Sequence, residues 1–252
     1  MQVTIIGTGN VATVFGRLLV ENGHSILQVY GRDHARAQEL AKALGAMAVS
    51  DTADINAHAD LYLIAVSDDA LPELAAAFSV GDKFVVHTAG SVSKEVLKQT
   101  SSNYGVIWPM KMIRKNMPEL GSPTIVIDGN TETGRNRVEA IARIFSTDIT
   151  RAGDAQRLKM HMLAAVVSNF PNHLYRLAAD YCEQEQIDFA VFYPIMQATV
   201  EQAQQHHPAE IQAGPAFRGD MDTIHKHEAM LQQYPQLLQL YIAMSNSIMR
   251  SV

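Results

Sequence analysis

The chain has very little cysteine: Cys182 is the only one among its 252 residues. An internal disulfide is therefore excluded, and a lone thiol is typical of proteins in a reducing compartment. Uninterrupted runs of about 20 apolar residues, which a membrane-spanning helix needs, are also missing from the sequence. The N-terminus has no basic stretch before an apolar one, the mark of a secretory signal, so we expect a soluble cytoplasmic protein with no membrane partner.

Basic residues are not in excess: 20 Lys and Arg stand against 26 Asp and Glu, a formal net charge of −6. This balance argues against a nucleic-acid scaffold and against a polybasic membrane-binding surface. Histidines occur as His206-His207 and as His225-x-His227, but adjacent or alternate residues on a helix point in different directions. We therefore expect no metal site and no nucleic acid, and a small molecule as the ligand.

What the sequence does contain is a glycine turn directly after its first apolar run. Residues 3–6 are followed by Gly7-Thr8-Gly9-Asn10-Val11-Ala12 and then by apolar residues at helical spacing. In this pattern the first glycine permits the tight turn, the second lets backbone N–H groups approach a pyrophosphate, and the small Ala12 lets the helix pack on its strand. The helix N-terminus adds unpaired N–H donors. The turn predicts a dinucleotide-binding βα unit whose ligand contacts Gly7, Thr8, Gly9, Asn10 and Val11.

The first half of the chain alternates short apolar runs with helical patterns, which is typical of a parallel sheet built from βαβ units. The predicted strands are residues 3–6, 26–30, 47–49, 61–66, 84–87, 105–108 and, at an edge of the sheet, 124–127. The predicted helices between them run from the glycine turn to Leu19, over 35–44 and over 136–145. The fold class is therefore α/β, a Rossmann-type doubly wound, mostly parallel sheet.

Beyond about Arg157 only helical patterns remain, over 158–185 and 191–205, from about Asp220, and from Pro235 to the end. This change predicts an all-helical C-terminal domain. We place the boundary so that residues 1–152 form the dinucleotide-binding domain and residues 153–252 form a helical domain for substrate binding and dimerisation.

The end of the second predicted strand bears on the choice of cofactor. NAD-binding folds place an acidic residue there, whereas an arginine can pair with the 2′-phosphate of NADP. Here the strand ends in Tyr30-Gly31-Arg32-Asp33, so Arg32 favours NADP. Asp33 keeps NAD as the alternative, unless it caps the next helix.

Two further strand ends point to the same crevice, because ligands bind at the carboxyl ends of the strands in open α/β sheets. We expect Ala65, Val66 and Ser67 after one strand, and Thr88 and Gly90 after the next, to contact the nucleotide. His87 is either a proton donor or a hydrogen-bonded structural residue. Asp68 and Asp69 are interpreted as helix-capping residues, and the residues of the segment Trp108 to Lys111 as part of the pocket wall.

The helical half carries two polar patterns. Asp220, Thr223 and His227 lie at i, i+3 and i+7, so they share one helix face, and Asp220 suits an N-cap. His161, Ser168, Asn169 and Asn172 form a polar stripe on an otherwise apolar helix, which faces either a wet cleft or another subunit. Arg218 either pins its loop to a carboxylate or binds substrate.

The chain resembles the Rossmann-like NADP oxidoreductases whose C-terminal helical domain has no known function. The resemblance rests on the glycine turn, on His87-Thr88-Ala89-Gly90-Ser91 and on the run Gly214-Pro215-x-x-Arg218-Gly219-Asp220-x-x-Thr223-x-x-x-His227. It covers nearly the whole chain, and the last run is specific to that group. The architecture is also similar to pyrroline-5-carboxylate reductase and to deazaflavin-dependent NADP reductases. Their helical domain dimerises and closes the active site over the nicotinamide, so the resemblance implies a homodimer.

The resemblance to β-hydroxyacid dehydrogenases is only partial. In that family a glycine-rich stretch precedes a catalytic lysine, with an asparagine four residues later. Here Gly153 and Lys159 match, but Leu163 stands where the asparagine would be. The resemblance therefore implies that His161 and Asn169 form the polar centre in place of the lysine-dependent arrangement.

The expected function is an NADP-dependent oxidoreductase that transfers a hydride between NADP(H) and a small carbonyl, imine or hydroxy compound. The substrate is expected between the sheet's carboxyl edge and the helical domain, and the catalytic candidates are His161, Asn169, Arg218, Asp220 and His227. His161 or His227 would move the proton, and Arg218 would hold a substrate carboxylate. The alternatives are a non-catalytic dinucleotide-binding sensor or scaffold that dimerises through its helical domain, and a turn that binds FAD or an adenosylmethionine-like ligand.

Overall fold

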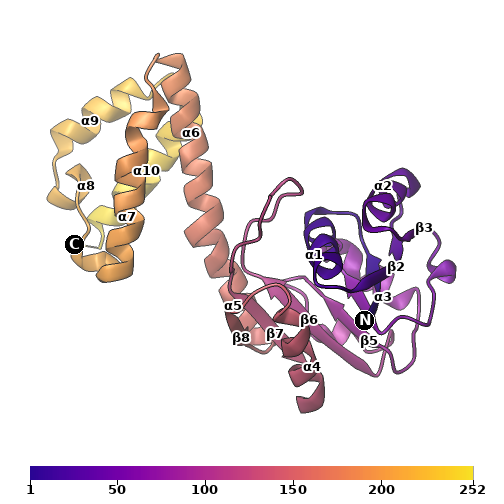
Figure 1. Ribbon diagram of the computed structural model, residues 1–252. Coiled ribbons are helices and arrows are strands. Elements are labelled where there is room, and N and C mark those ends of the chain that lie inside the picture. Colours follow the sequence, from indigo (N-terminus) through magenta and orange to yellow (C-terminus); the bar gives the residue numbers. More distant parts are fainter. Residues whose placement is uncertain (252) are drawn as a thin grey trace. The chain divides into compact units, whose positions relative to one another are not determined.

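The computed structural model describes residues 1–251 and divides into two compact units, Met1–Ala164 and the part from Ala165 onward (Figure 1). The first unit is built on an eight-stranded sheet in the order β3-β2-β1-β4-β5-β6-β7-β8. Its strands are β1 (Gln2–Ile6), β2 (Ser25–Tyr30), β3 (Met47–Val49), β4 (Leu61–Ile64), β5 (Phe84–His87), β6 (Asn103–Pro109), β7 (Ile125–Gly129) and β8 (Ile149–Arg151). Every neighbouring pair is parallel except β6 and β7, which confirms the predicted, mostly parallel α/β fold.

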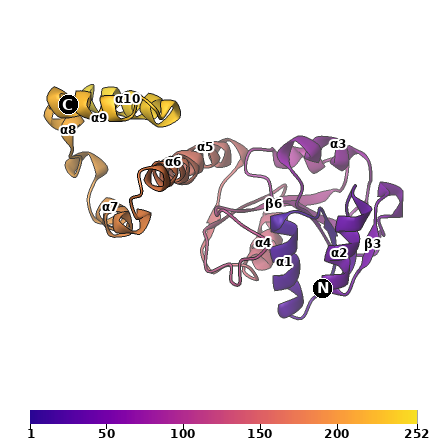
Figure 2. The same cartoon turned by 90° about the horizontal axis from the view of Figure 1, so that it is seen from above.

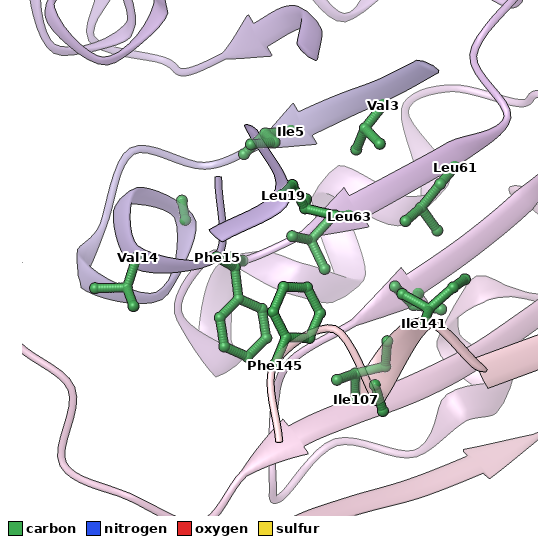
Figure 3. Packing of buried hydrophobic residues seen from close by; sticks show 14 of the residues in the cluster. Val3, Ile5, Val14, Phe15, Leu19, Leu61, Leu63, Ile107, Ile141 and Phe145 are labelled. Atoms are coloured by element: carbon green, nitrogen blue, oxygen red, sulfur yellow. The ribbon is translucent and has the colours of Figure 1, made fainter. Parts of the chain in front are cut away.

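Helices cover both faces of this sheet, as the view from above shows (Figure 2). The helices of the first unit are α1 (Asn10–Glu21), α2 (His34–Leu44), α3 (Leu71–Ala76), α4 (Glu132–Ala142) and α5 (Asp154–Ala164). Because successive side chains of a strand point to opposite faces, Ile5 packs with α1, α2 and α4, whereas Ile6 packs with α3. The rings of Phe15 in α1 and Phe145 after α4 stack with centroids 4.0 Å apart within the first of these cores (Figure 3).

Two predicted elements of the first unit need correction. The segment 124–127 is not an edge strand, because β8 pairs in parallel with β7 on its outer side. A strand of only three residues leaves no apolar pattern to detect. Helix α4 begins at Glu132 instead of residue 136, because the Thr131 hydroxyl accepts from the Gly134 N–H and caps the helix one turn earlier.

The second unit is helical, with α6 (Phe170–Gln184), α7 (Tyr193–Gln205), α8 (Pro215–Arg218), α9 (Met221–Met230) and α10 (Pro235–Met249). The predicted single helix over 158–185 is wrong in one respect: a π-helical turn, Ala165–Asn169, separates α5 from α6. Pro171 lies directly beyond this turn and lacks the N–H that an α-helix would donate to residue 167. The widened turn breaks the regular spacing on which the stripe from His161 to Asn172 was predicted.

Helix α5 belongs to the first unit, although the predicted domain boundary lies before it, at residues 152 and 153. Its residues Met160 and Ala164 pack on Val106, Trp108 and Val126 of the sheet. The change from strands to helices in the sequence therefore precedes the end of the compact unit. Among residues 1–251, no helix combines the length and the apolar character that crossing a membrane requires.

Candidate active site

A cavity of about 920 Å³ opens at the carboxyl edge of the sheet in the first unit. Its volume lies near the upper end of the range for small-molecule sites, which suits an extended ligand. It is lined by ten of the residues predicted to bind the nucleotide, namely Gly7, Thr8, Gly9, Asn10, Val11, Arg32, Ala65, Val66, Ser67 and Thr88. Gly90 is the one predicted nucleotide-binding residue that is not part of this lining.

The glycine turn has the shape that a pyrophosphate site needs. Gly7 has a φ of 123°, and a Cβ there would overlap the Ala65 carbonyl oxygen, so only glycine fits between β1 and β4. Gly9 is the N-cap of α1, and a Cβ there would meet no heavy atom within 4 Å. No side chain of the described residues caps this helix, so its first N–H groups stay available to an anion.

The end of β2 presents an arginine to the cavity. Asp33 caps α2 by accepting from the Arg36 N–H at 3.2 Å, and its carboxylate also lies 3.4 Å from Arg36 Nε. Arg32 is exposed and has no hydrogen-bond or ion-pair partner within residues 1–251. The Asp33 carboxylate is thus used as the N-cap of α2, whereas the Arg32 guanidinium is available to bind a substituent of the ribose.

The wall of this cavity also contains charged residues that were not predicted from the sequence. Arg36, Glu73 and Lys115 also line the cavity. Arg36 lies one turn into α2 from the strand end, a spacing that could have pointed to it. Lys115 lies in the long connection between β6 and β7, and nothing in the sequence indicates where such a loop folds back.

The end of β5 is buried and polar. His87 is fully buried, and its Nδ1 accepts from the Ala89 N–H at 3.2 Å. Burial, reinforced by the positive charge of Arg157, lowers the pKa of His87 to about 3. A histidine held neutral in this way suits the predicted structural role better than that of a proton donor.

A partly buried ionic network joins this strand end to α5. Arg157 is only 1% exposed and donates to the Asp154 carboxylate at 2.8 Å and to the Val92 carbonyl at 2.5 Å. Asp154 also accepts from the Ser93 hydroxyl, and Lys94 Nζ lies 2.8 Å from the Asp128 carboxylate in β7. The network fixes the start of α5 to the ends of two strands.

His161 stands on α5 one turn beyond Arg157, next to the end of β5. A Cβ on Gly90 would lie 2.5 Å from His161 Cδ2, so the absent side chain makes room for the imidazole. The ring centroids of His161 and Trp108 are 5.5 Å apart, and Trp108 lines the cavity. Of the five predicted catalytic residues, His161 is the one that the first unit contains.

The other four lie in the second unit. Asn169 is exposed in the π-helical turn, and Arg218 is exposed at the end of α8. Asp220 caps α9, accepting from the Thr223 N–H at 3.1 Å and from its hydroxyl at 2.8 Å, and these bonds lower the pKa of Asp220. His227 Nδ1 lies 2.8 Å from the Tyr241 hydroxyl of α10. Within this unit, Asp220 therefore caps its own helix, and His227 links α9 to α10.

Comparison with known proteins bears on both halves of the chain. The family described as "NADP oxidoreductase coenzyme F420-dependent" matches residues 2–90, and a domain of unknown function, DUF2520, matches residues 124–248. A search of curated protein sequences gives no match. The first family's description names NADP, the cofactor expected from Arg32.

Solved structures share the fold over the whole length. A putative NADP oxidoreductase from Bacteroides fragilis is 32% identical, with 99% of this chain and 98% of that chain covered and a TM-score of 0.90. A reductive aminase from Aspergillus terreus, solved with NADPH, is 17% identical, with coverage of 99% and 94% and a TM-score of 0.76. 1-Pyrroline-5-carboxylate reductase from Streptococcus pyogenes is 15% identical, with coverage of 99% and 98% and a TM-score of 0.64. The last two identities show a common fold only. On its 32% identity to the Bacteroides protein and its match to both domains, the chain belongs to the NADP oxidoreductase family with a C-terminal domain of unknown function.

Proposed function

We propose that this protein is an NADP(H)-dependent oxidoreductase acting on a small carbonyl, imine or hydroxy compound. One observation carries the proposal: a single cavity combines the open glycine turn of α1, the unpaired Arg32 and the ends of β4, β5 and β6. In open α/β sheets this edge is where dinucleotides bind.

Each part of the cavity has a task in this proposal. The N–H groups at the start of α1 bind the pyrophosphate, and Arg32 binds the 2′-phosphate with a charge-assisted hydrogen bond. Ser67 and Thr88 offer hydroxyl groups to the nucleotide beyond β4 and β5. The bound nicotinamide supplies or accepts the hydride, so the chain itself needs to position the reactants, exclude water and move one proton.

His161 is the proposed proton donor or acceptor. It is half-buried, it touches the cavity wall at Trp108, and an imidazole can both donate and accept a proton. His87, with its pKa lowered to about 3, is a poor choice for that task. Asn169, Arg218, Asp220 and His227 remain predicted contributors, with Arg218 as the partner of a substrate carboxylate.

Titration of the purified protein with NADPH, NADH and FAD tests the proposal. We expect NADPH to bind more tightly than NADH and FAD not to bind. No detectable binding of NADPH would overturn the cofactor assignment. Binding of NADPH without oxidation in the presence of a panel of carbonyl and imine compounds would instead favour the non-catalytic sensor.

We also propose that the helical unit associates with a second copy of the chain. Its buried apolar side chains, among the described residues, are only Leu177, Cys182, Ala216, Ile224 and Leu231. Large apolar side chains at least half exposed in the same unit are Val167, Phe170, Val191, Tyr193, Ile195, Val200, Met230 and Met244. An apolar surface of this extent is typical of an interface, and homo-oligomers are the commonest assemblies of soluble proteins.

A further inference from the structure

The cavity has a basic wall that neither the glycine turn nor Arg32 explains. Lys115 lies between β6 and β7, yet it lines the same cavity as the segment from Thr8 to Val11. Its ammonium group has no ion-pair or hydrogen-bond partner in the described part of the chain, and the residue is exposed. An unpaired cation facing a ligand cavity is a candidate for binding an anionic part of the ligand.

The loop that carries Lys115 is anchored by buried side chains and by hydrogen bonds within the loop. Ile113 and Leu120 are 9% and 3% exposed and belong to the same core cluster as Phe15 of α1. Lys111 Nζ donates to the Leu120 carbonyl at 2.6 Å, which closes the loop on itself. A further bond, from the Met117 N–H to the Arg114 carbonyl at 3.1 Å, closes a turn with Lys115 in its centre.

Arg17 ties this loop to the predicted phosphate-binding helix. Its Nη2 donates to the Met117 carbonyl at 2.8 Å and to the Pro118 carbonyl at 3.2 Å. Arg17 belongs to α1, whose first turn lines the cavity. The turn around Lys115 is therefore fixed by hydrogen bonds to the helix whose first turn lines the cavity.

We propose that Lys115 binds the pyrophosphate of the dinucleotide, and that Arg17 is the positioning residue that holds its loop. This inference rests on the proposed function. In the sheet order, β2 and β6 lie on opposite sides of β1, so Arg32 and Lys115 approach the N-terminus of α1 from opposite sides. Because NADP and NAD share the pyrophosphate, Lys115 contributes affinity for both and does not discriminate between them.

The test measures dissociation constants of NADPH and NADH by calorimetric titration. We expect Lys115→Gln to weaken both dinucleotides by the same factor, about tenfold, the usual effect of losing one charge-assisted hydrogen bond. Lys115→Arg should retain most of the affinity. Arg32→Gln should weaken NADPH alone, and Lys98→Gln, an exposed lysine outside the cavity, should leave both constants unchanged.

Arg17 is tested in a double-mutant cycle. Arg17→Gln should weaken both dinucleotides in the wild-type background and have little further effect in the Lys115→Gln background, because the two residues act through one contact. The thermal unfolding midpoint of each variant reports on folding.

The inference is overturned if Lys115→Gln binds like Lys98→Gln, or if it loses affinity for NADPH alone, which would place Lys115 at the 2′-phosphate. Additive effects of the Arg17 and Lys115 variants would remove Arg17 from the proposal. Failure of the wild-type chain to bind NADPH would instead overturn the proposed function, so the two failures are distinguishable.

Discussion

At the scale of single residues, the most consequential feature is the space left by Gly90. The imidazole of His161 and the indole of Trp108 occupy the volume that a side chain at position 90 would need. Here a glycine is required for a close approach of side chains and not for an unusual backbone conformation. The position of the proposed proton donor on α5 thus depends on a residue in the loop after β5.

Gly90→Ala should displace His161. The added Cβ would lie 2.5 Å from His161 Cδ2 and 2.7 Å from Trp108 Cε2, and neither contact is tolerable without movement. Misplacing a catalytic group by about 1 Å lowers turnover by about 10²-fold. We expect a loss of this order for Gly90→Ala, whereas nucleotide binding at the glycine turn should persist. Steady-state kinetics and NADPH titration measure the two effects. Gly153→Ala is the control, because its Cβ would meet its nearest atom at 3.9 Å, and equal activity of the two variants would contradict the prediction.

The buried histidine at the end of β5 predicts a pH dependence of stability. The pKa of His87 is about 3 in the folded chain, below an ordinary value near 6.5. As the pH falls, His87 therefore takes up a proton in the unfolded chain before it does so in the folded chain. The contribution of His87 to the free energy of unfolding is at its maximum above about pH 6.5 and declines between pH 6.5 and 3. Between pH 7 and pH 5 the loss amounts to ~2 kcal/mol.

Urea unfolding at pH 7 and pH 5 tests this. The wild-type chain should lose free energy of unfolding over that interval, and His87→Asn, which does not titrate, should lose less. Asp154 does not interfere in this range, because the hydrogen bonds from Ser93, Lys94 and Arg157 outweigh burial and lower its pKa. Identical pH profiles of the two proteins would show that His87 is not the titrating group.

At the scale of elements, helix termini decide several roles. Asp33 and Asp220 were both open to a functional interpretation in the sequence, and both accept from the N–H three residues later as helix caps. For Asp33 the cap removes the strongest argument for NAD. For Asp220, the cap alone accounts for an aspartate three residues before Thr223, and no catalytic role is needed to explain it.

Substitutions separate capping from catalysis at Asp220. Asp220→Ala should lower stability by about 1 kcal/mol, the usual loss of a cap, whereas Asp220→Asn keeps an acceptor and should stay close to the wild type. Thermal unfolding measures both. If Asp220→Asn folds normally but loses turnover, the carboxylate has a chemical role beyond the cap. Asp222→Ala, in the same first turn, is the matched control.

At the scale of the whole molecule, the helical unit is short of buried apolar surface. Ile195 on α7 is 66% exposed and Val167 is 71% exposed, although both are large apolar residues. A unit that leaves such residues in water gains little from the hydrophobic effect on its own. Association with a second copy would bury them.

Sedimentation equilibrium should therefore show a dimer of the wild-type chain at micromolar concentrations. Ile195→Asp should shift the equilibrium toward monomer, because burying a charge without a partner is costly. Gln202→Asp, an exposed polar residue on the same helix, should leave the dimer intact. A monomeric wild-type protein at these concentrations would contradict the proposal.

Local sequence determined the sheet, the glycine turn and most strand ends, because a buried parallel strand and a turn that needs glycine each leave a pattern within a few residues. Ten predicted nucleotide-binding residues line one cavity for the same reason: the carboxyl ends of parallel strands meet at one edge. The edge strand β8 and the approach of Lys115 to α1 were decided by tertiary structure alone. Each depends on contacts between residues far apart in the chain, such as Arg17 with Met117, and those contacts have no period in the sequence.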